Sequence, residues 1–136
     1  MLLAEVPAAA RLLAAQIRPA RVRKDVGGGR AVMVIPAFLA NDLATHQLRR
    51  TLGACGFEPY GWAQGLNLGA RRGKFDRLLR RIDIIAAETR GPVALVGWSL
   101  GGLYARELAK RRADSVSMVV TLGTPFSQSL RANNAW

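Results

Sequence analysis

The chain has 136 residues, half of them apolar, and its 20 Lys and Arg against 9 Asp and Glu give a formal net charge of +11. This composition argues against disorder and predicts a single globular domain spanning residues 1–136. With one cysteine and one histidine, the sequence excludes an internal disulfide and a zinc site. We expect no metal, no cofactor and a cytoplasmic location.

The surplus of positive charge favours anionic partners. The arginines are scattered without interleaved aromatic residues, so nucleic acid is not an expected partner. Residues 1–24 are rich in Ala and Leu at helical spacing and end in a basic cluster, which predicts a basic amphipathic N-terminal helix. Glu5 and Arg11 interrupt its apolar character, so we expect neither a secretory signal nor a membrane span. This helix either docks on the domain or touches an anionic membrane surface as a peripheral contact.

The rest of the chain alternates between strand and helix patterns. Continuous apolar runs predict buried strands, and a period near 3.6 residues predicts helices. In chain order we expect a strand at 31–35, a helix at 43–55 capped by Asn41 or Asp42, a strand at 57–62, a helix at 74–89, a strand at 93–97, a helix at 100–112 and a strand at 115–122. Such alternation predicts an α/β fold of about four parallel strands, with flanking helices on both faces of one sheet.

The stretch 93–102 carries a G-x-S-x-G motif made by Gly97, Ser99 and Gly101. It follows an expected buried strand and opens an expected helix, which is the context of a nucleophile elbow. In such an elbow the serine lies on a strained turn with its hydroxyl exposed, and small residues two positions before and after it leave room. The amide of Leu100, at the helix start, then faces developing negative charge. We therefore interpret Ser99 as a nucleophile.

A dinucleotide-binding loop is the rival interpretation, because Gly97, Ser99 and Gly102 also lie between a strand and a helix. That loop needs glycine at the central position and an acidic residue at the end of the next strand. This chain has Ser99 at the first place and Leu122-Gly123 at the second, so the elbow is favoured.

Besides the elbow segment Gly97-Trp98-Ser99-Leu100-Gly101-Gly102, the chain contains Ile35-Pro36-Ala37-Phe38, Tyr60-Gly61-Trp62 followed by Asn67-Leu68-Gly69, and Val120-Thr121-Leu122-Gly123-Thr124-Pro125. Together these segments, from about Ala31 to Phe126, resemble the bacterial lipase- and esterase-like branch of the α/β-hydrolases. The resemblance implies ester hydrolysis through an acyl-enzyme, with the amides of Phe38 and Leu100 as the oxyanion hole. Pro36 also has a simpler interpretation, as the end of a strand.

Two details of the loop after the first strand bear on this resemblance. Family members often have glycine where this chain has Ala37; if that position needs a positive φ, alanine strains it. Phe38 and Trp98, on either side of the expected site, indicate an apolar pocket.

The family's triad runs Ser, then Asp or Glu, then His. After Ser99 this chain has only the acids Glu107, inside an expected helix, and Asp114, before the last strand, and no histidine. His46 lies upstream and is interpreted as a helical surface residue, and Cys55 as a small buried residue near a helix end. The family fold has about eight strands, so the resemblance covers only its N-terminal, nucleophile-bearing half, as in a truncated chain.

Two functions remain open. One is a serine hydrolase acting on small-molecule or lipid esters, incomplete as this chain. The other is a non-catalytic remnant that serves as an interaction or lipid-surface-binding module. By family analogy the strands lie in the order second, first, third, fourth, which leaves the fourth strand at a bare sheet edge that a partner strand could pair with.

Overall fold

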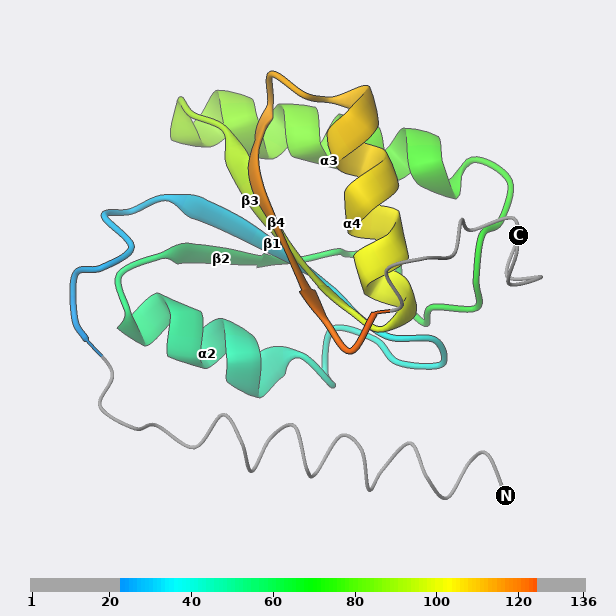
Figure 1. Cartoon of the computed structure of the whole chain (residues 1–136), viewed down its shortest axis with the longest axis horizontal. Coiled ribbons are helices and arrows are strands. Elements are labelled where there is room, and N and C mark those ends of the chain that lie inside the picture. Colours follow the sequence, from blue (N-terminus) through cyan, green and yellow to red (C-terminus); the bar gives the residue numbers. More distant parts are fainter. Residues whose placement is uncertain (1–22, 125–136) are drawn as a thin grey trace.

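The computed structural model describes residues 23–124; most of the expected N-terminal helix and residues 125–136 lie outside this range. The four strands are β1 (Ala31–Ile35), β2 (Glu58–Gly61), β3 (Val93–Trp98) and β4 (Val116–Leu122), and the helices of this range are α2 (His46–Ala54), α3 (Lys74–Thr89) and α4 (Leu100–Arg111). All strand pairs are parallel, in the order β2-β1-β3-β4 (Figure 1). The sheet, its parallel pairing and its order confirm the sequence predictions.

Strand β1 forms the centre of the hydrophobic core because both of its faces are covered. All five of its residues are buried. Met33 and Ile35 pack with side chains of α3 and α4, whereas Val32 and Val34 pack on the side of α2. Figure 1 shows the same arrangement, with α2 on one face of the sheet and α3 and α4 on the other. A continuous apolar run is the sequence pattern of such a doubly covered parallel strand.

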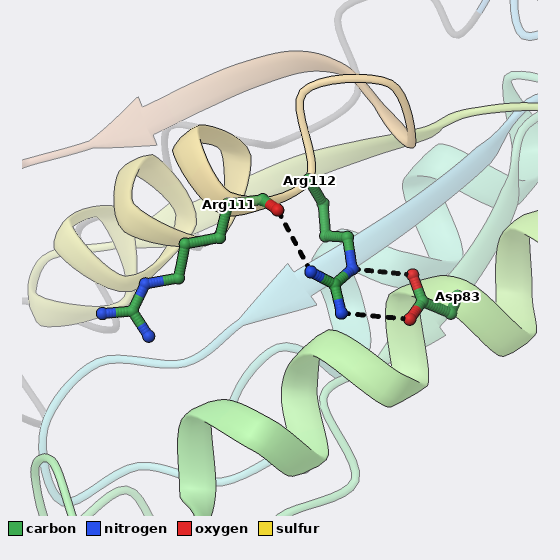
Figure 2. A network of polar contacts seen from close by, with 3 residues as sticks. All are labelled: Asp83, Arg111 and Arg112. Atoms are coloured by element: carbon green, nitrogen blue, oxygen red, sulfur yellow. Dashed lines mark hydrogen bonds and ion pairs between the residues drawn. The ribbon is translucent and has the colours of Figure 1, made fainter.

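Helix α3 lies over the sheet with one apolar stripe. Its buried apolar residues follow a helical period: Phe75, Leu78, Leu79, Ile82 and Ile85. At its outer side, Asp83 accepts two hydrogen bonds from Arg112, which follows α4, at 3.0 and 3.3 Å (Figure 2). Arg112 also donates to the carbonyl oxygen of Arg111 at 3.1 Å. This bidentate contact ties the end of α4 to α3, but its partial exposure limits its contribution to stability.

Helix α2 is shorter than predicted, and its cap is different. It begins at His46 rather than at residue 43, with Thr45 at the cap position and no side-chain cap hydrogen bond. Asn41 instead accepts a hydrogen bond from the Leu43 amide at 3.0 Å, which stabilises a local turn. The carboxylate of Asp42 binds two amides after β2 and is not free to cap the helix. The other expected strands and helices agree with the structure to within one residue at each end.

The two edges of the sheet differ. The β2 edge is four residues long, contains Pro59 and is bound at the Gly61 carbonyl by the Arg81 side chain. The β4 edge is seven residues long and uncharged, with Met118 and Val120 exposed. Native edges are commonly protected by short length, proline or charge, and β4 has none of these. Pairing of this edge with another strand stays a prediction. Within residues 23–124, no helix has the length and apolar character needed to cross a membrane.

Candidate active site

Ser99 lies on the turn that joins the end of β3 to the start of α4. Its backbone has φ 51° and ψ −116°, a combination that a residue with a side chain rarely adopts. The side chain is partly exposed at the carboxyl end of the sheet. Leu100 is the first residue of α4, where a backbone N–H has no acceptor within the helix. The strained backbone predicted for Ser99 is therefore present, and a helix N-terminus begins beside it.

Glycines make this turn sterically possible. A Cβ on Gly97 would overlap the backbone of Gly101, and a Cβ on Gly101 would overlap the carbonyl oxygen of Ile35. Neither residue needs a positive φ; each is required because another backbone segment passes where its side chain would be. The elbow is therefore packed directly against the end of β1.

Hydrogen bonds fix the backbone of Ser99 on both sides. Its amide donates to the carbonyl oxygen of Leu122 at 2.7 Å, which extends the pairing of β3 with β4. Its own carbonyl oxygen accepts from the Gly102 amide at 2.9 Å and from the hydroxyl of Thr124 at 2.8 Å. Thr124 is buried and packs on Gly102. Sequence analysis gave Thr124 no role of its own, because its contact with Ser99 spans 25 residues of chain.

The loop after β1 approaches the elbow from the neighbouring strand. Ala37 is buried and does not have a positive φ, so the strain considered for that position is absent. Leu39 has the positive φ instead, at 63°. Phe38 lies between them with its side chain 48% exposed. The loop thus places the strained residue two positions later than the family resemblance indicated.

Asn67 holds this loop in place. It is fully buried, and its Nδ2 donates to the carbonyl oxygen of Pro36 at 2.8 Å. Its backbone carbonyl accepts from the Leu39 amide at 2.7 Å, and its amide donates to the carbonyl oxygen of Ala40 at 2.8 Å. Its Oδ1 accepts from the Gly69 amide at 3.1 Å. In the sequence, Asn67 stands out only as part of the segment Asn67-Leu68-Gly69. No local pattern shows that it bonds Pro36, 31 residues away.

Asp42 provides a second anchor for the same loop. Its Oδ1 accepts a hydrogen bond from the Trp62 amide at 2.9 Å, and its Oδ2 accepts from the Ala63 amide at 3.0 Å. Gly61 leaves the space for this contact, because a Cβ there would lie 2.6 Å from the carboxylate. A carboxylate that accepts two amide hydrogen bonds is a strong, charge-assisted anchor. The loops after β1 and β2 are therefore joined at two points.

Comparison with known proteins identifies the fold. No family model matches the chain, and no curated protein sequence matches it. Two solved structures do resemble it. One is a variant of PytH, 22% identical over 70% of this chain and 40% of that chain, with a TM-score of 0.54. The other is Aspergillus fumigatus lipase B, 18% identical over 78% of this chain and 27% of that chain, with a TM-score of 0.55. The chain has part of an α/β-hydrolase fold. It spans less than half the length of either neighbour.

Within this hydrolase fold, the other titratable residues considered from sequence lie in ordinary surroundings. His46 is exposed at the first position of α2. Glu107 lies within α4 and pairs with Lys110 at 3.1 Å, and Asp114 is exposed before β4. Cys55 is half-buried at the end of α2 rather than buried. Among residues 23–124, no group of three or more His, Cys, Asp or Glu is placed to hold a metal ion.

Lys74 is a buried charged residue that contacts the loop after β2. Its side chain is buried, its Nζ donates to the carbonyl oxygen of Gly69 at 3.1 Å, and it lies 4.9 Å from the centre of the Trp62 ring. Burial lowers the pKa of Lys74, and the positive charges of Arg71 and Arg77 lower it further. Lys74 thus stabilises the loop after β2 through its contacts with Gly69 and Trp62. Helical periodicity does not predict this role, because it predicts apolar and not charged residues at buried positions.

Proposed function

We propose that this chain carries the nucleophile and the oxyanion-binding amides of a serine hydrolase that acts on carboxylic esters. The backbone of Ser99 supports this most directly: it is held at φ 51° and ψ −116° on a turn packed by Gly97 and Gly101. Such strain is typical of functional sites. The hydrolase-like fold around it agrees with this role.

In the proposed reaction the Ser99 Oγ attacks the ester carbonyl carbon while a base takes the hydroxyl proton. The carbonyl oxygen becomes an oxyanion, which the backbone amides of Leu100 and Phe38 stabilise. The intermediate then breaks the bond to the alcohol oxygen, and the alcohol leaves with the proton from the base. Water attacks the acyl-serine in the same way and releases the carboxylic acid and free Ser99.

The reaction also needs a base and an acid that orients it. The only histidine of the sequence is His46, which is exposed on α2, on the sheet face opposite α4. We propose that a histidine and an acid come from polypeptide outside this sequence. A serine hydroxyl is a weak nucleophile without a base, so the chain alone reacts slowly. Oxyanion binding and substrate positioning leave at most about 10³ to 10⁴-fold over water.

The test is labelling of Ser99 with a fluorophosphonate, with imidazole added as an external base. We expect slow labelling that speeds up with imidazole concentration, with the mass increase mapped to Ser99. Ser99→Ala abolishes it and His46→Ala leaves it unchanged. Labelling that imidazole does not accelerate, or that persists in Ser99→Ala, contradicts the proposal. Loss in His46→Ala would make His46 the base.

A second function has its own support. Exposed apolar side chains gather on the loops after β1 and β2, as expected of a binding module without catalysis. Two results together would favour this non-catalytic role. Ser99 would stay unlabelled by the fluorophosphonate, and the wild type and Ser99→Ala would both hydrolyse p-nitrophenyl butyrate at the background rate in the presence of imidazole.

A further inference from the structure

Most of the large exposed apolar side chains of residues 23–124 belong to two loops at the carboxyl end of the sheet. Five side chains there are between 39% and 80% exposed: Phe38, Leu39, Leu43, Leu66 and Leu68. We call these five residues the apolar rim. The other large exposed apolar residues lie apart from it, near the start of β1, on α3 and on β4: Val26, Ile84, Met118 and Val120. Scattered single residues are ordinary on a protein surface, but five of them on two adjoining loops need an explanation.

Hydrogen bonds hold the two loops of the apolar rim side by side. Asn67 lies between Leu66 and Leu68 in the chain and bonds the backbone of Leu39 and Ala40 at 2.7 and 2.8 Å. Asp42, one residue before Leu43, binds the amides of Trp62 and Ala63 just after β2. The residues of the apolar rim therefore come from two loops that are joined at their backbones.

The apolar rim contains a residue with a strained backbone, Leu39. Leu39 has φ 63°, a conformation that costs a leucine about 1 kcal/mol or more. The Leu39 amide is fixed by its hydrogen bond to the Asn67 carbonyl oxygen at 2.7 Å, while 39% of the residue stays exposed. Backbone strain of this kind persists mostly where a function depends on it.

Charge next to the apolar rim indicates what binds it. Arg71 and Arg72 follow Leu68 closely and are exposed. Asp42, the one acid within these two loops, has both carboxylate oxygens engaged by backbone amides. The chain as a whole carries +11. Apolar side chains bordered by arginines on a positively charged protein match the surface of an anionic bilayer, which takes up apolar groups and attracts cations.

We propose that the apolar rim, with Arg71 and Arg72, docks on an anionic lipid surface. Docking would hold the carboxyl end of the sheet, where Ser99 lies, against the bilayer. Binding itself does not require a reactive serine, so the proposal can fail or succeed independently of the proposed hydrolysis.

The first experiment is co-sedimentation of the full chain with vesicles of phosphatidylglycerol and phosphatidylcholine in equal parts, and with pure phosphatidylcholine. We expect binding to the anionic vesicles, weakened by salt and unchanged in Ser99→Ala. Leu43→Ser with Leu66→Ser lowers the partition coefficient by about tenfold. Arg71→Gln and Arg72→Gln lower it by about fivefold each on anionic vesicles. Ile84→Ser and Met118→Ser, whose residues are 57% and 58% exposed elsewhere on the surface, are the matched controls and bind as the wild type does.

A second measurement reports the docked face directly. In a Cys55→Ser background, Leu43→Cys carries a thiol-reactive nitrobenzoxadiazole dye on the apolar rim, and Met118→Cys carries the same dye on β4. Nitroxide-labelled lipid in the anionic vesicles should quench the first dye and spare the second. No vesicle binding at all would overturn the proposal and leave an apolar protein partner as the occupant. Wild-type binding in the rim variants would also overturn it, because binding would then belong to another part of the chain, such as residues 1–22. Equal loss in the control variants would overturn it as well.

Discussion

The two loops that meet at the carboxyl end of the sheet are built in opposite ways. The elbow at Ser99 is shaped by close contact: Gly97 and Gly101 are there because neighbouring backbone leaves no space for a side chain. The loop after β1 contains no glycine from Pro36 to Thr45 and is held by polar contacts from Asn67 and Asp42. The glycines that the elbow needs are thus visible within its own motif, whereas the other loop depends on side-chain hydrogen bonds between residues 20 to 31 positions apart.

This difference predicts which substitutions each loop tolerates. The elbow should fail abruptly when volume is added, since backbone atoms cannot move aside. The loop after β1 should loosen when a hydrogen bond is removed, while the sheet beneath it stays folded.

The largest effect is expected for Gly101→Ala. Its Cβ would overlap the Ile35 carbonyl and lie 2.8 Å from the Pro36 oxygen, so β1 or α4 must shift. We expect the free energy of unfolding to fall by about 3 kcal/mol or more, measured by urea denaturation. Gly53→Ala is the control, because a Cβ there lies 3.7 Å from Pro59 and the helix gains an alanine. Equal stability of the two variants would show that the elbow is not tightly packed.

Asn67→Ala should have the next largest effect. It leaves the buried Pro36 oxygen and the Gly69 amide without their partners, at a cost of about 2–3 kcal/mol. Hydrogen exchange should accelerate at Leu39 and Ala40 more than in β1, because the loop opens locally. Asn41→Ala, which removes an exposed turn contact, should change stability by less than about 0.5 kcal/mol. Uniform acceleration across the sheet would mean that the loop has no local stability of its own.

Lys74 makes the loop after β2 sensitive to pH. Its pKa is lowered in the folded state by burial, so the unfolded chain keeps its proton at pH values where the folded chain has released it. Stability therefore rises with pH from the lowered folded pKa up to the unfolded value of about 10.5 and is flat outside that window. Lys74→Met should remove this rise. Urea denaturation of both proteins at several pH values would then show that the difference between their free energies of unfolding changes across the window. A constant difference at every pH would contradict the lowered pKa.

The smallest effects concern strain in the loop after β1. Leu39→Gly should raise the free energy of unfolding by about 0.5 kcal/mol, since relief of its positive φ outweighs the added chain entropy. Ala37→Gly has no such strain to relieve and should lower stability by about 0.5–1 kcal/mol. Thermal unfolding of the pair distinguishes the two positions. The reverse order would place the strain at Ala37, as the family pattern indicated.

The sequence predicts the elements that follow a local pattern and misses the contacts that join distant segments. The run 31–35 and the helix at 74–89 were predicted with their observed bounds, because a continuous apolar run and a helical apolar period are both visible in the sequence. The start of α2 was placed three residues too early, because the Asp42 carboxylate binds the amides of Trp62 and Ala63 after β2 instead of capping the helix. The roles of Asn67, Thr124 and Lys74 were missed, since each depends on a partner that no local pattern reveals.

The sequence by itself determined the alternation of strands and helices, the strand order implied by its resemblance, and the elbow at Ser99. Each of these rests on steric rules that act over a few residues: periodic burial, and glycine where backbone segments cross. Only the tertiary structure decided how the loop after β1 is held and where the apolar side chains gather. Those features depend on hydrogen bonds between segments far apart in the chain, and such pairs become neighbours only once the sheet has formed.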